Sequence, residues 1–293
     1  MAAKRSTPFP WPLARLARAV AYIRGPGRTP ALLFLVLAIF FHGWYVAWGR
    51  VEKQERARYV LRVDQVQVTP LPPWIHTDVR AEVFRSASRD PPLSLLDDDL
   101  TDWLKHAFKL HPWVARVNGV ATRPGHVDVD LAYRQPVLMV EVAPDLFLPV
   151  DVEGMLLPNG DFSPNEMRSY ACLAGIDTRP MGSIGQRWGD ARVLDAAQIA
   201  AGLGPAWQKI KLFRIQPAAA AGPAAVGEPT YEMFTQAGTR IVWGLAPGTK
   251  VLGEPSAAEK VARLGQYAAE HGGLDAPGTG QPLDVRAMPP ARK

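Results

Sequence analysis

The apolar residues of the chain are concentrated in one long run near the start. Residues Ala31 to Trp48 read ALLFLVLAIFFHGWYVAW, which is long enough to cross a bilayer as a helix. The run contains no Asp, Glu, Lys or Arg, and Trp44 and Trp48 crowd the end where aromatic rings favour the headgroup level. The pattern predicts one transmembrane anchor over 31–49. Its anchor residues include Leu32, Leu33, Phe34, Phe40, Trp44 and Trp48.

Two other kinds of segment can contain such an apolar run. A cleaved signal peptide has an apolar core of about 7 to 15 residues that ends in small residues, whereas this run is longer and ends in aromatic residues. A buried helix of a globular domain would carry a polar face, and none is visible here. An uncleaved anchor is therefore the preferred interpretation.

The distribution of charge predicts the orientation of this anchor. The first 30 residues carry six basic and no acidic residues, whereas basic and acidic residues are mixed after the run. The positive-inside rule then places the N-terminus in the cytoplasm and the body outside it, on the cytoplasmic (inner) membrane. Outside this tail, 33 − 6 = 27 basic residues face 28 acidic ones, so composition predicts a lipid bilayer as partner and no nucleic acid.

The remaining pattern predicts an α+β chain with two domains after a juxtamembrane stalk over 50–61. The first domain, 62–136, has the order β-α-α-β-β, with three strands and helices on one face. Its predicted elements are a strand at Val63–Val68, helices at Trp74–Ser86 and Leu100–Phe108, and strands at Trp113–Ala121 and Val127–Tyr133. Asp97 or Asp98 is expected to cap the second helix.

The second domain, 137–288, is predicted to be mainly antiparallel β with flanking helices, followed by a tail over 289–293. Ser256 and Glu259 fit a capping box at the start of the last helix. A loop is expected over 217–227. The predicted strands are Val137–Val142, Leu146–Val152, Met155–Leu157, Lys209–Ile215, Tyr231–Phe234, Thr239–Trp243 and Pro282–Met288, with a further helix at Asp190–Leu203.

The sequence contains no recognisable constellation for catalysis or for cofactor binding. It has no phosphate-binding G-x-x-x-x-G-K-[ST] loop and no G-x-G-x-x-G after a strand. Isolated candidates are better explained by structural roles. We interpret Ser183 as a turn serine, His106 and His111 as solvated or capping residues, and Asp97 to Asp99 as a helix N-terminus. Asp151 with Glu153 is interpreted as a hairpin turn, and Cys172 as a core residue. We therefore expect no catalytic residue, metal site, cofactor or small-molecule substrate, and binding through exposed sheet edges is favoured over catalysis.

Several local motifs resemble one family in their order and spacing. Residues His111 to Val117 (HPWVARV), Arg123-Pro124, and Tyr133 to Pro136 (YRQP) resemble the POTRA domain of the FtsQ/DivIB bacterial cell-division proteins. Residues 148–158 (LPVDVEGMLLP) resemble the hairpin that opens the family's β domain, and 259–264 with 283–286 resemble its closing helix and strand.

The resemblance implies a non-enzymatic scaffold of septum assembly. Such a scaffold recruits other division membrane proteins, small single-pass coiled-coil proteins among them, through its POTRA domain and β-domain edge. On this chain the partner edge would comprise Leu283, Asp284, Val285 and Arg286. Two alternatives stay open: a POTRA-bearing envelope transport or secretion component, and a membrane-anchored hydrolase.

Overall fold

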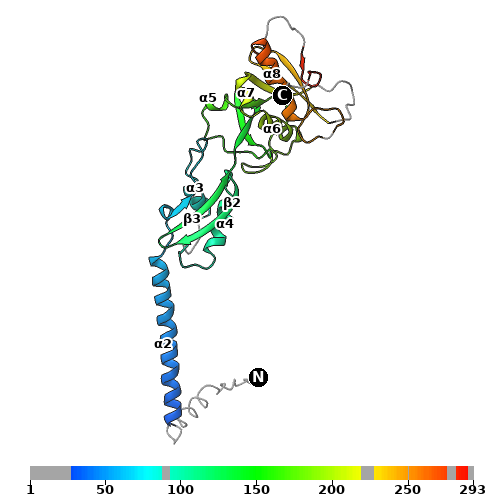
Figure 1. The fold of residues 1–293 in the computed structure, drawn as a ribbon. Helices are drawn as coiled ribbons and strands as arrows, with labels where there is room; N and C mark the ends of the chain where they lie inside the picture. Colours follow the sequence, from blue (N-terminus) through cyan, green and yellow to red (C-terminus); the bar gives the residue numbers. More distant parts are fainter. Residues whose placement is uncertain (1–27, 88–92, 219–227, 250, 276–281, 290–293) are drawn as a thin grey trace, which may run out of the picture. The chain divides into compact units, whose positions relative to one another are not determined.

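A computed structural model describes residues 28–87, 93–218, 228–249, 251–275 and 282–289. Its first element is α2 (Arg28–Arg58), one unbroken helix of 31 residues (Figure 1). Within α2, the 19 residues Leu32–Arg50 are apolar and long enough to cross a membrane, and none of this stretch is buried inside the protein. The predicted anchor over 31–49 and most of the predicted stalk therefore lie on one continuous helix. The basic tail before residue 28 lies outside the described residues.

Backbone hydrogen bonds tie the chain just after α2 to residues 93–97. Leu61 N–H donates to Leu93 O, and Leu95 N–H donates to Tyr59 O, both at 2.8 Å. By its contacts the chain divides into two compact units. One comprises residues 28–61 with residues 93–97, and the other comprises the rest of the described residues.

The second unit contains a three-stranded sheet in the order β1-β3-β2. β1 runs parallel to β3, and β2 runs antiparallel to it. Two helices, α3 and α4, separate β1 from β2 in the chain, and α4 packs against β2. The bounds are η1 Val63–Gln65, β1 Val66–Val68, α3 Val79–Ser86, α4 Leu100–Lys109, β2 Val114–Arg123 and β3 His126–Tyr133.

The helix predicted at Leu100–Phe108 is confirmed as α4, and it buries one apolar side. Leu100, Leu104, Ala107 and Phe108 are all buried, because spacings of three and four residues place them on one side of the helix. The expected cap was wrong by one or two residues. The helix begins at Leu100, so its N-cap residue is Asp99 rather than Asp97 or Asp98.

A seven-stranded sheet follows, in the order β10-β9-β8-β7-β6-β4-β5. The strands are β4 Pro136–Ala143, β5 Leu146–Asp151, β6 Ala171–Leu173, β7 Leu212–Pro217, β8 Thr230–Thr235, β9 Arg240–Leu245 and β10 Leu283–Asp284. The helices are α5 Pro164–Met167, α6 Ala191–Leu203, α7 Ala206–Lys209 and α8 Ala257–His271. Lys209, predicted to open a strand, ends α7 instead, and 155–157 forms only isolated bridges. The loop expected over 217–227 lies mostly outside the described residues.

The prediction of a mainly antiparallel sheet was wrong, because three of its six neighbouring pairs are parallel. These are β4 with β6, β6 with β7, and β9 with β10. Parallel neighbours need a crossover connection, and helices supply it twice: α6 and α7 lie between β6 and β7, and α8 lies between β9 and β10. These helices therefore connect parallel strands of the sheet, in contrast to the flanking helices that were predicted.

The two faces of the large sheet have different surroundings. Along β8, Tyr231 and Met233 are buried with the apolar residues of α6, whereas Glu232 alternates with them on the opposite face. That opposite face carries ion pairs, among them Glu232 with Arg240. The hydrophobic core therefore lies between the sheet and its helices, and the other face of the sheet carries charged pairs.

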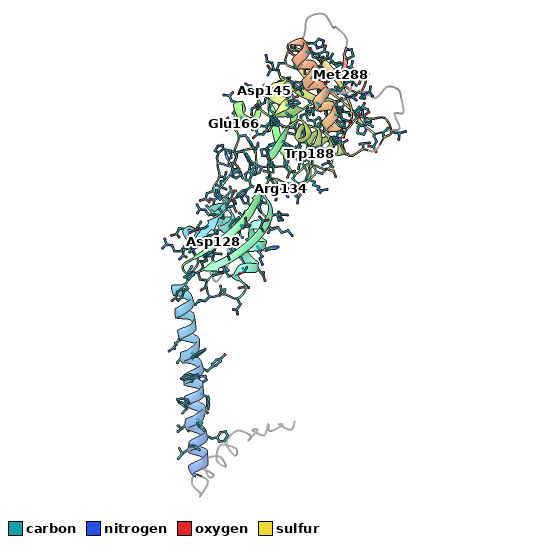
Figure 2. The ribbon with its side chains drawn as sticks, in the orientation of Figure 1. Asp128, Arg134, Asp145, Glu166, Trp188 and Met288 are labelled. Carbon is teal, nitrogen blue, oxygen red and sulfur yellow. The ribbon has the colours of Figure 1, made fainter. Side chains whose placement is uncertain are left out.

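Polar contacts stabilise the junction between the two sheets, where β4 directly follows β3 in the chain. Arg134 lies there (Figure 2), and its Nη1 donates to Asp151 Oδ2 at 2.6 Å. Asp161 is 6% exposed and accepts hydrogen bonds from His76 N–H, from Thr77 and from the indole of Trp113. Since all three donors belong to the part of the chain that forms the smaller sheet, this carboxylate fixes that part against the larger one.

Candidate functional site at the edge of the large sheet

The predicted partner edge lies at one end of the seven-stranded sheet. β10 is the last strand of the order and pairs in parallel with β9, with Leu283 opposite Ile241. The predicted strand over Pro282–Met288 is shorter than expected. Ala287 N–H donates to Asp284 O at 3.2 Å, and this turn ends the strand after two residues.

The side chains of the edge alternate between core and surface. Leu283 is 9% exposed and Val285 is fully buried, whereas Asp284 is half-buried and Arg286 is exposed. This alternation is the period of an extended chain, in which successive side chains point to opposite faces. The structure therefore brings the four predicted residues together, two as core anchors and two as a polar surface.

Most backbone groups on the outer side of this edge already have partners. Val285 N–H donates to Val242 O at 3.2 Å, so the N–H and C=O of Asp284, one residue earlier, face away from β9. The C=O of Asp284 accepts from Ala287 N–H, and Arg286 N–H donates to Asp284 Oδ1 at 3.0 Å. Among the described residues, the N–H of Asp284 is then the outward group of β10 left for a new strand.

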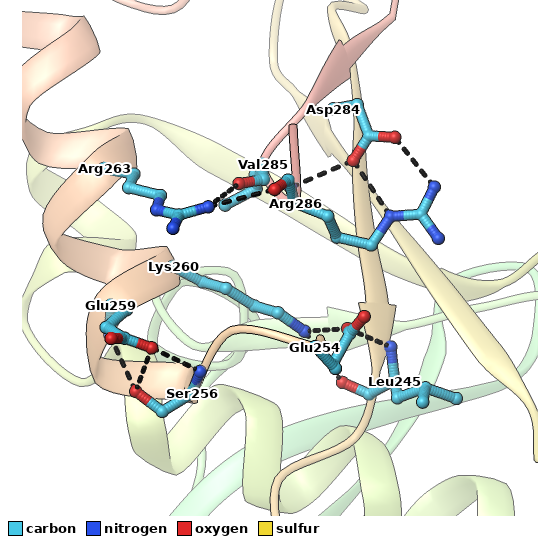
Figure 3. A network of polar contacts seen from close by, with 9 residues as sticks. All are labelled: Leu245, Glu254, Ser256, Glu259, Lys260, Arg263, Asp284, Val285 and Arg286. Carbon is cyan, nitrogen blue, oxygen red and sulfur yellow. Dashed lines mark hydrogen bonds and ion pairs between the residues drawn. The ribbon is translucent and has the colours of Figure 1, made fainter. Parts of the chain in front are cut away.

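The helix α8 holds the residues that follow β10 in place (Figure 3). Arg263 Nη1 donates to Val285 O at 3.1 Å and to Arg286 O at 3.0 Å. One guanidinium thus satisfies two carbonyl groups that follow β10. Because Arg263 lies on the element that precedes β10, the position of the edge depends on the docking of α8.

An ion pair covers the polar side of the edge. Arg286 Nη2 lies 2.7 Å from Asp284 Oδ2, and its Nε lies 3.0 Å from Oδ1. The hydrogen bonds from Arg286 hold the pKa of the Asp284 carboxyl below its usual range, and the same contact raises the pKa of Arg286. The pair therefore stays charged at neutral pH and places one negative and one positive charge next to the outward N–H of Asp284.

β9 extends past its pairing with β10, and a buried lysine lies at its last residue. Lys260 is 1% exposed, and its Nζ donates to Glu254 Oε1 at 2.5 Å and to Leu245 O at 3.2 Å. Glu254 Oε1 also accepts from Leu245 N–H at 3.0 Å (Figure 3). The Nζ lies 5.0 Å from the ring centroid of Trp243. Side chains thus satisfy the backbone of Leu245, so β9 offers no further pairing there.

A shallow hollow of about 410 Å³ adjoins the edge. Its rim carries two apolar side chains, Val251 at 51% exposure and Leu252 at 105%. The residues around it are Val251, Leu252, Gly253, Glu254, Asp284, Arg286 and Ala287. The edge therefore combines one outward backbone N–H, a charged pair and an exposed apolar tip.

The predicted anchor residues lie along α2 and are all exposed. Leu32, Leu33, Phe34, Phe40, Trp44 and Trp48 have exposures between 52% and 78%. Phe40 stacks on Trp44, and Trp44 stacks on Trp48, with ring centroids 6.3 Å and 5.9 Å apart. The spacing of four residues places these three rings on one side of the helix.

The residues considered as possible catalytic or metal-binding groups have structural roles. The interpretation of His111 as a solvated or capping residue was wrong: it is 7% exposed, its Nε2 lies 2.9 Å from Glu82 Oε2, and its Nδ1 accepts from Trp113 N–H. Asp151 Oδ1 accepts from the N–H groups of Glu153 and Met155, as expected for a turn. Within the described ranges, no group of three or more His, Cys, Asp or Glu could hold a metal ion.

Two other residues considered for catalysis, Ser183 and Cys172, also lie in surroundings typical of structural residues. Ser183 lies in a turn, where its N–H donates to Gln186 Oε1 at 3.0 Å. Cys172 is half-buried in β6, and burial raises the pKa of its thiol to about 12. The thiol is therefore protonated and weakly nucleophilic at neutral pH.

Sequence reasoning missed the side chains that shape the edge, namely Glu254, Lys260 and Arg263. Lys260 and Arg263 lie on the last predicted helix, where charged residues are ordinarily solvated. One signal was that Lys260 lies four positions before the apolar residue Leu264, on the same face of the helix. Glu254 gives no local signal, because its role depends on Leu245, nine residues earlier in the chain.

Comparison with known proteins assigns no family to the chain. No protein-family model matches the chain, and no curated protein sequence matches it.

Proposed function

We propose that this chain is a non-enzymatic, single-pass membrane scaffold of bacterial cell division, related to the FtsQ/DivIB proteins. The N-terminus lies in the cytoplasm, α2 spans the inner membrane, and the body lies outside the cytoplasm. The POTRA-like domain corresponds to 62–136 and the β domain to 137–288. Its partners are other division membrane proteins, small single-pass coiled-coil proteins among them.

One observation carries this proposal: the large sheet ends in a short strand that has an outward backbone N–H and an exposed apolar tip beside it. A partner in extended conformation can pair with such an edge and place an apolar side chain on Val251 and Leu252. The apolar stretch of α2 supports the membrane part of the proposal. The YRQP and LPVDVEGMLLP motifs support the family.

The turn after Asp284 limits how a partner binds. Ala287 N–H and the Arg286 side chain both engage Asp284, so a long added strand must first open this turn. A partner that binds without opening it can pair over little more than Asp284 and the residues before it. The proposal therefore expects either a short contact or a local rearrangement of 284–287 on binding.

A localisation experiment tests the cellular role. A fluorescent fusion of the full chain should collect at the septum of dividing cells, and small single-pass membrane proteins should co-purify after solubilisation. A uniform envelope signal in dividing cells contradicts a division scaffold. A chain extracted from membranes by alkaline carbonate contradicts the anchor.

A pair of matched substitutions tests the edge itself. Leu252→Asp places a charge on the exposed tip without touching a strand hydrogen bond, and it should reduce partner recovery at least tenfold. Leu146→Asp makes the same change at another exposed leucine, which begins β5 at the opposite end of the sheet, and should leave recovery unchanged. Val285→Pro removes the N–H that holds β10 to β9. Unchanged partner recovery in Leu252→Asp and in a folded Val285→Pro chain excludes this edge as the binding site.

A further inference from the structure

A groove of about 550 Å³ lies between α7 and α8, which are both labelled in Figure 1. It shares no residue with the hollow beside β10. Its floor is apolar, since Ile210 is 7% exposed and Leu274 is 3% exposed. Val261, Gly265 and Ala268 form one wall, because spacings of four and three residues place them on the same side of α8. A Cβ at Gly265 would meet nothing within 4 Å, so this wall leaves open space.

Two positively charged residues line the groove from α7 and the residues after it. Lys209 is the last residue of α7 and Lys211 follows two positions later, and both side chains are exposed. Within the described ranges, neither ammonium group has an ion-pair partner. Among the described lining residues, Asp275 carries the one carboxylate, and its Oδ1 already accepts hydrogen bonds from the hydroxyls of Thr235 and Thr239. The groove therefore carries unpaired positive charge beside an apolar floor.

The backbone of Lys211 is strained. Its φ is +55°, in the left-handed region that favours glycine. Lys211 directly follows Ile210, the C-cap residue of α7, and this is the position where helices most often place glycine. Its N–H donates to Gln208 O at 3.1 Å, and its C=O accepts from Gln236 N–H at 3.3 Å, so the surrounding structure holds this conformation. Strain of this kind is typical of sites where the side chain has a function.

The walls of the groove favour a helix as occupant. Both walls are helices, whose backbone N–H and C=O groups are hydrogen-bonded within the helix. At the end of α8, the N–H groups of Gly272 and Gly273 both donate to Ala268 O. An extended segment would therefore bury backbone groups without partners, whereas a helix satisfies its own. The wall from Val261 to His271 is about 15 Å long, which is enough for nearly three helical turns.

We infer that this groove binds an acidic amphipathic helix of a partner protein. The apolar side of the partner helix would lie against Ile210, Gly265 and Ala268, and its carboxylates would pair with Lys209 and Lys211. Charge complementarity selects this occupant, because the two lysines would repel a basic helix and would stay unpaired beside an uncharged one. The groove is a surface separate from β10, so its role does not depend on the cellular function proposed above.

A peptide-binding measurement on the full chain tests the groove. The chain is placed in phosphatidylcholine nanodiscs, and the probe is a fluorescein-labelled, hydrocarbon-stapled helix of about 15 residues with Leu on one side and Glu on the other. Fluorescence anisotropy, corrected for empty nanodiscs, should show saturable binding that is about tenfold tighter than for the same peptide with Lys in place of Glu. Equal affinity for the two peptides, or no binding of either, overturns the inference.

Matched variants locate the binding in the groove. Lys209→Glu with Lys211→Glu should weaken binding of the acidic peptide about tenfold. Lys105→Glu with Lys109→Glu makes the same change in net charge at two exposed lysines of α4 and should leave binding unchanged. Gly265→Leu fills the open wall and should weaken binding, and the fold should be retained because Leu is a better helix former than Gly. Unchanged binding in Lys209→Glu with Lys211→Glu excludes this groove.

Lys211→Gly separates a binding role of this side chain from a structural one. Glycine relieves the strained φ, so the variant should be at least as stable as the parent chain in urea denaturation, yet bind the acidic peptide about threefold more weakly. Lys211→Arg keeps the positive charge and should bind like the parent. A Lys211→Gly chain that binds as tightly as the parent contradicts the role of Lys211.

The groove and the edge at β10 fail in different experiments. Loss of peptide binding in Lys209→Glu with Lys211→Glu should leave partner recovery through Leu252 intact, because the two surfaces share no residue. If the parent chain instead forms a concentration-dependent dimer that these two substitutions abolish, a second copy occupies the groove and the inference is overturned.

Discussion

The indole Nε1 of Trp113 donates a hydrogen bond of 2.7 Å to Oδ2 of Asp161, 48 residues later in the chain. Trp113 is fully buried directly before β2, and Asp161 belongs to the loop after β5. The other carboxylate oxygen, Oδ1, accepts from His76 N–H, Thr77 N–H and Thr77 Oγ1. One side chain therefore holds three separate residues of the smaller sheet's part of the chain.

Replacement of Asp161 should destabilise the chain markedly. Asp161→Ala leaves several buried donors without an acceptor, and we expect a loss of about 3 kcal/mol in the free energy of unfolding. Asp161→Asn keeps one acceptor but turns an NH₂ group toward the Trp113 or Thr77 donors, so it should lose about half as much. Urea denaturation of the detergent-solubilised chain measures both. A double-mutant cycle with Trp113→Phe should give a coupling of at least about 0.5 kcal/mol, and additive effects would contradict the contact.

The buried ion pair between Lys260 and Glu254 should be costly to break on one side. Lys260→Met leaves the Glu254 carboxylate without its cation, and we expect a loss of about 3 kcal/mol. In the double variant Lys260→Met, Glu254→Gln, the Gln oxygen still accepts from Leu245 N–H, so part of that loss should be recovered. The same denaturation experiment reads both values. A double variant that is less stable than Lys260→Met contradicts the pairing.

Gly244 is expected to accept a side chain only with a loss of stability. Its φ is +88°, and a Cβ there would lie 2.7 Å from Arg286 Cδ. Gly248 has a similar φ of +92° with nothing within 4 Å, so Gly248→Ala isolates the backbone cost of about 1 kcal/mol. Gly244→Ala should lose that amount and at least about 1 kcal/mol more from the clash. Equal losses would show that the space beside Arg286 is open.

Asp195 should make stability depend on pH in an unusual direction. Burial raises the pKa of its carboxyl, with Glu228 and Asp190 adding to the effect, although Tyr231 Oη donates to it at 2.7 Å. The folded state binds this proton more tightly than the unfolded state, so the contribution of Asp195 falls as pH rises above about 4. Asp195→Asn should therefore be more stable than the parent chain at pH 7, with the difference vanishing below about pH 4 in urea denaturation at a series of pH values.

The neighbouring Asp177 provides a control of opposite sign. It is exposed, and the hydrogen bond from Arg192 holds its pKa below the usual range. Its contribution is present above the ordinary carboxyl pKa and is lost as pH falls. Asp177→Asn should thus be slightly less stable than the parent at pH 7. If both variants shift stability in the same direction, the assignment for Asp195 is wrong.

Local patterns were predictable from the sequence because their causes are local. Ser256 and Glu259 form the capping box as expected: Ser256 Oγ accepts from Glu259 N–H, and Glu259 Oε2 accepts from Ser256 N–H. The buried stripe of α4 follows in the same way from residues three and four apart. Such features need no knowledge of where the rest of the chain lies.

Pairing between distant segments was not predictable in this way. The parallel neighbours β6 and β7 are joined through α6, and the sequence shows each element but not which side of a strand the next one takes. The edge depends on Arg263, whose target carbonyls lie 22 and 23 residues later in the chain. Charged residues on a helix ordinarily face water, so only the folded structure distinguishes Arg263 and Lys260 from solvated neighbours.

The hydrogen bonds from Arg263 to the carbonyls after β10 also impose an order on synthesis. β9 emerges first, then α8, and the two residues of β10 follow both of them. The edge can form only after α8 has been made and has docked. A chain interrupted before residue 286 would thus contain most of the large sheet but lack the surface on which partners are proposed to assemble.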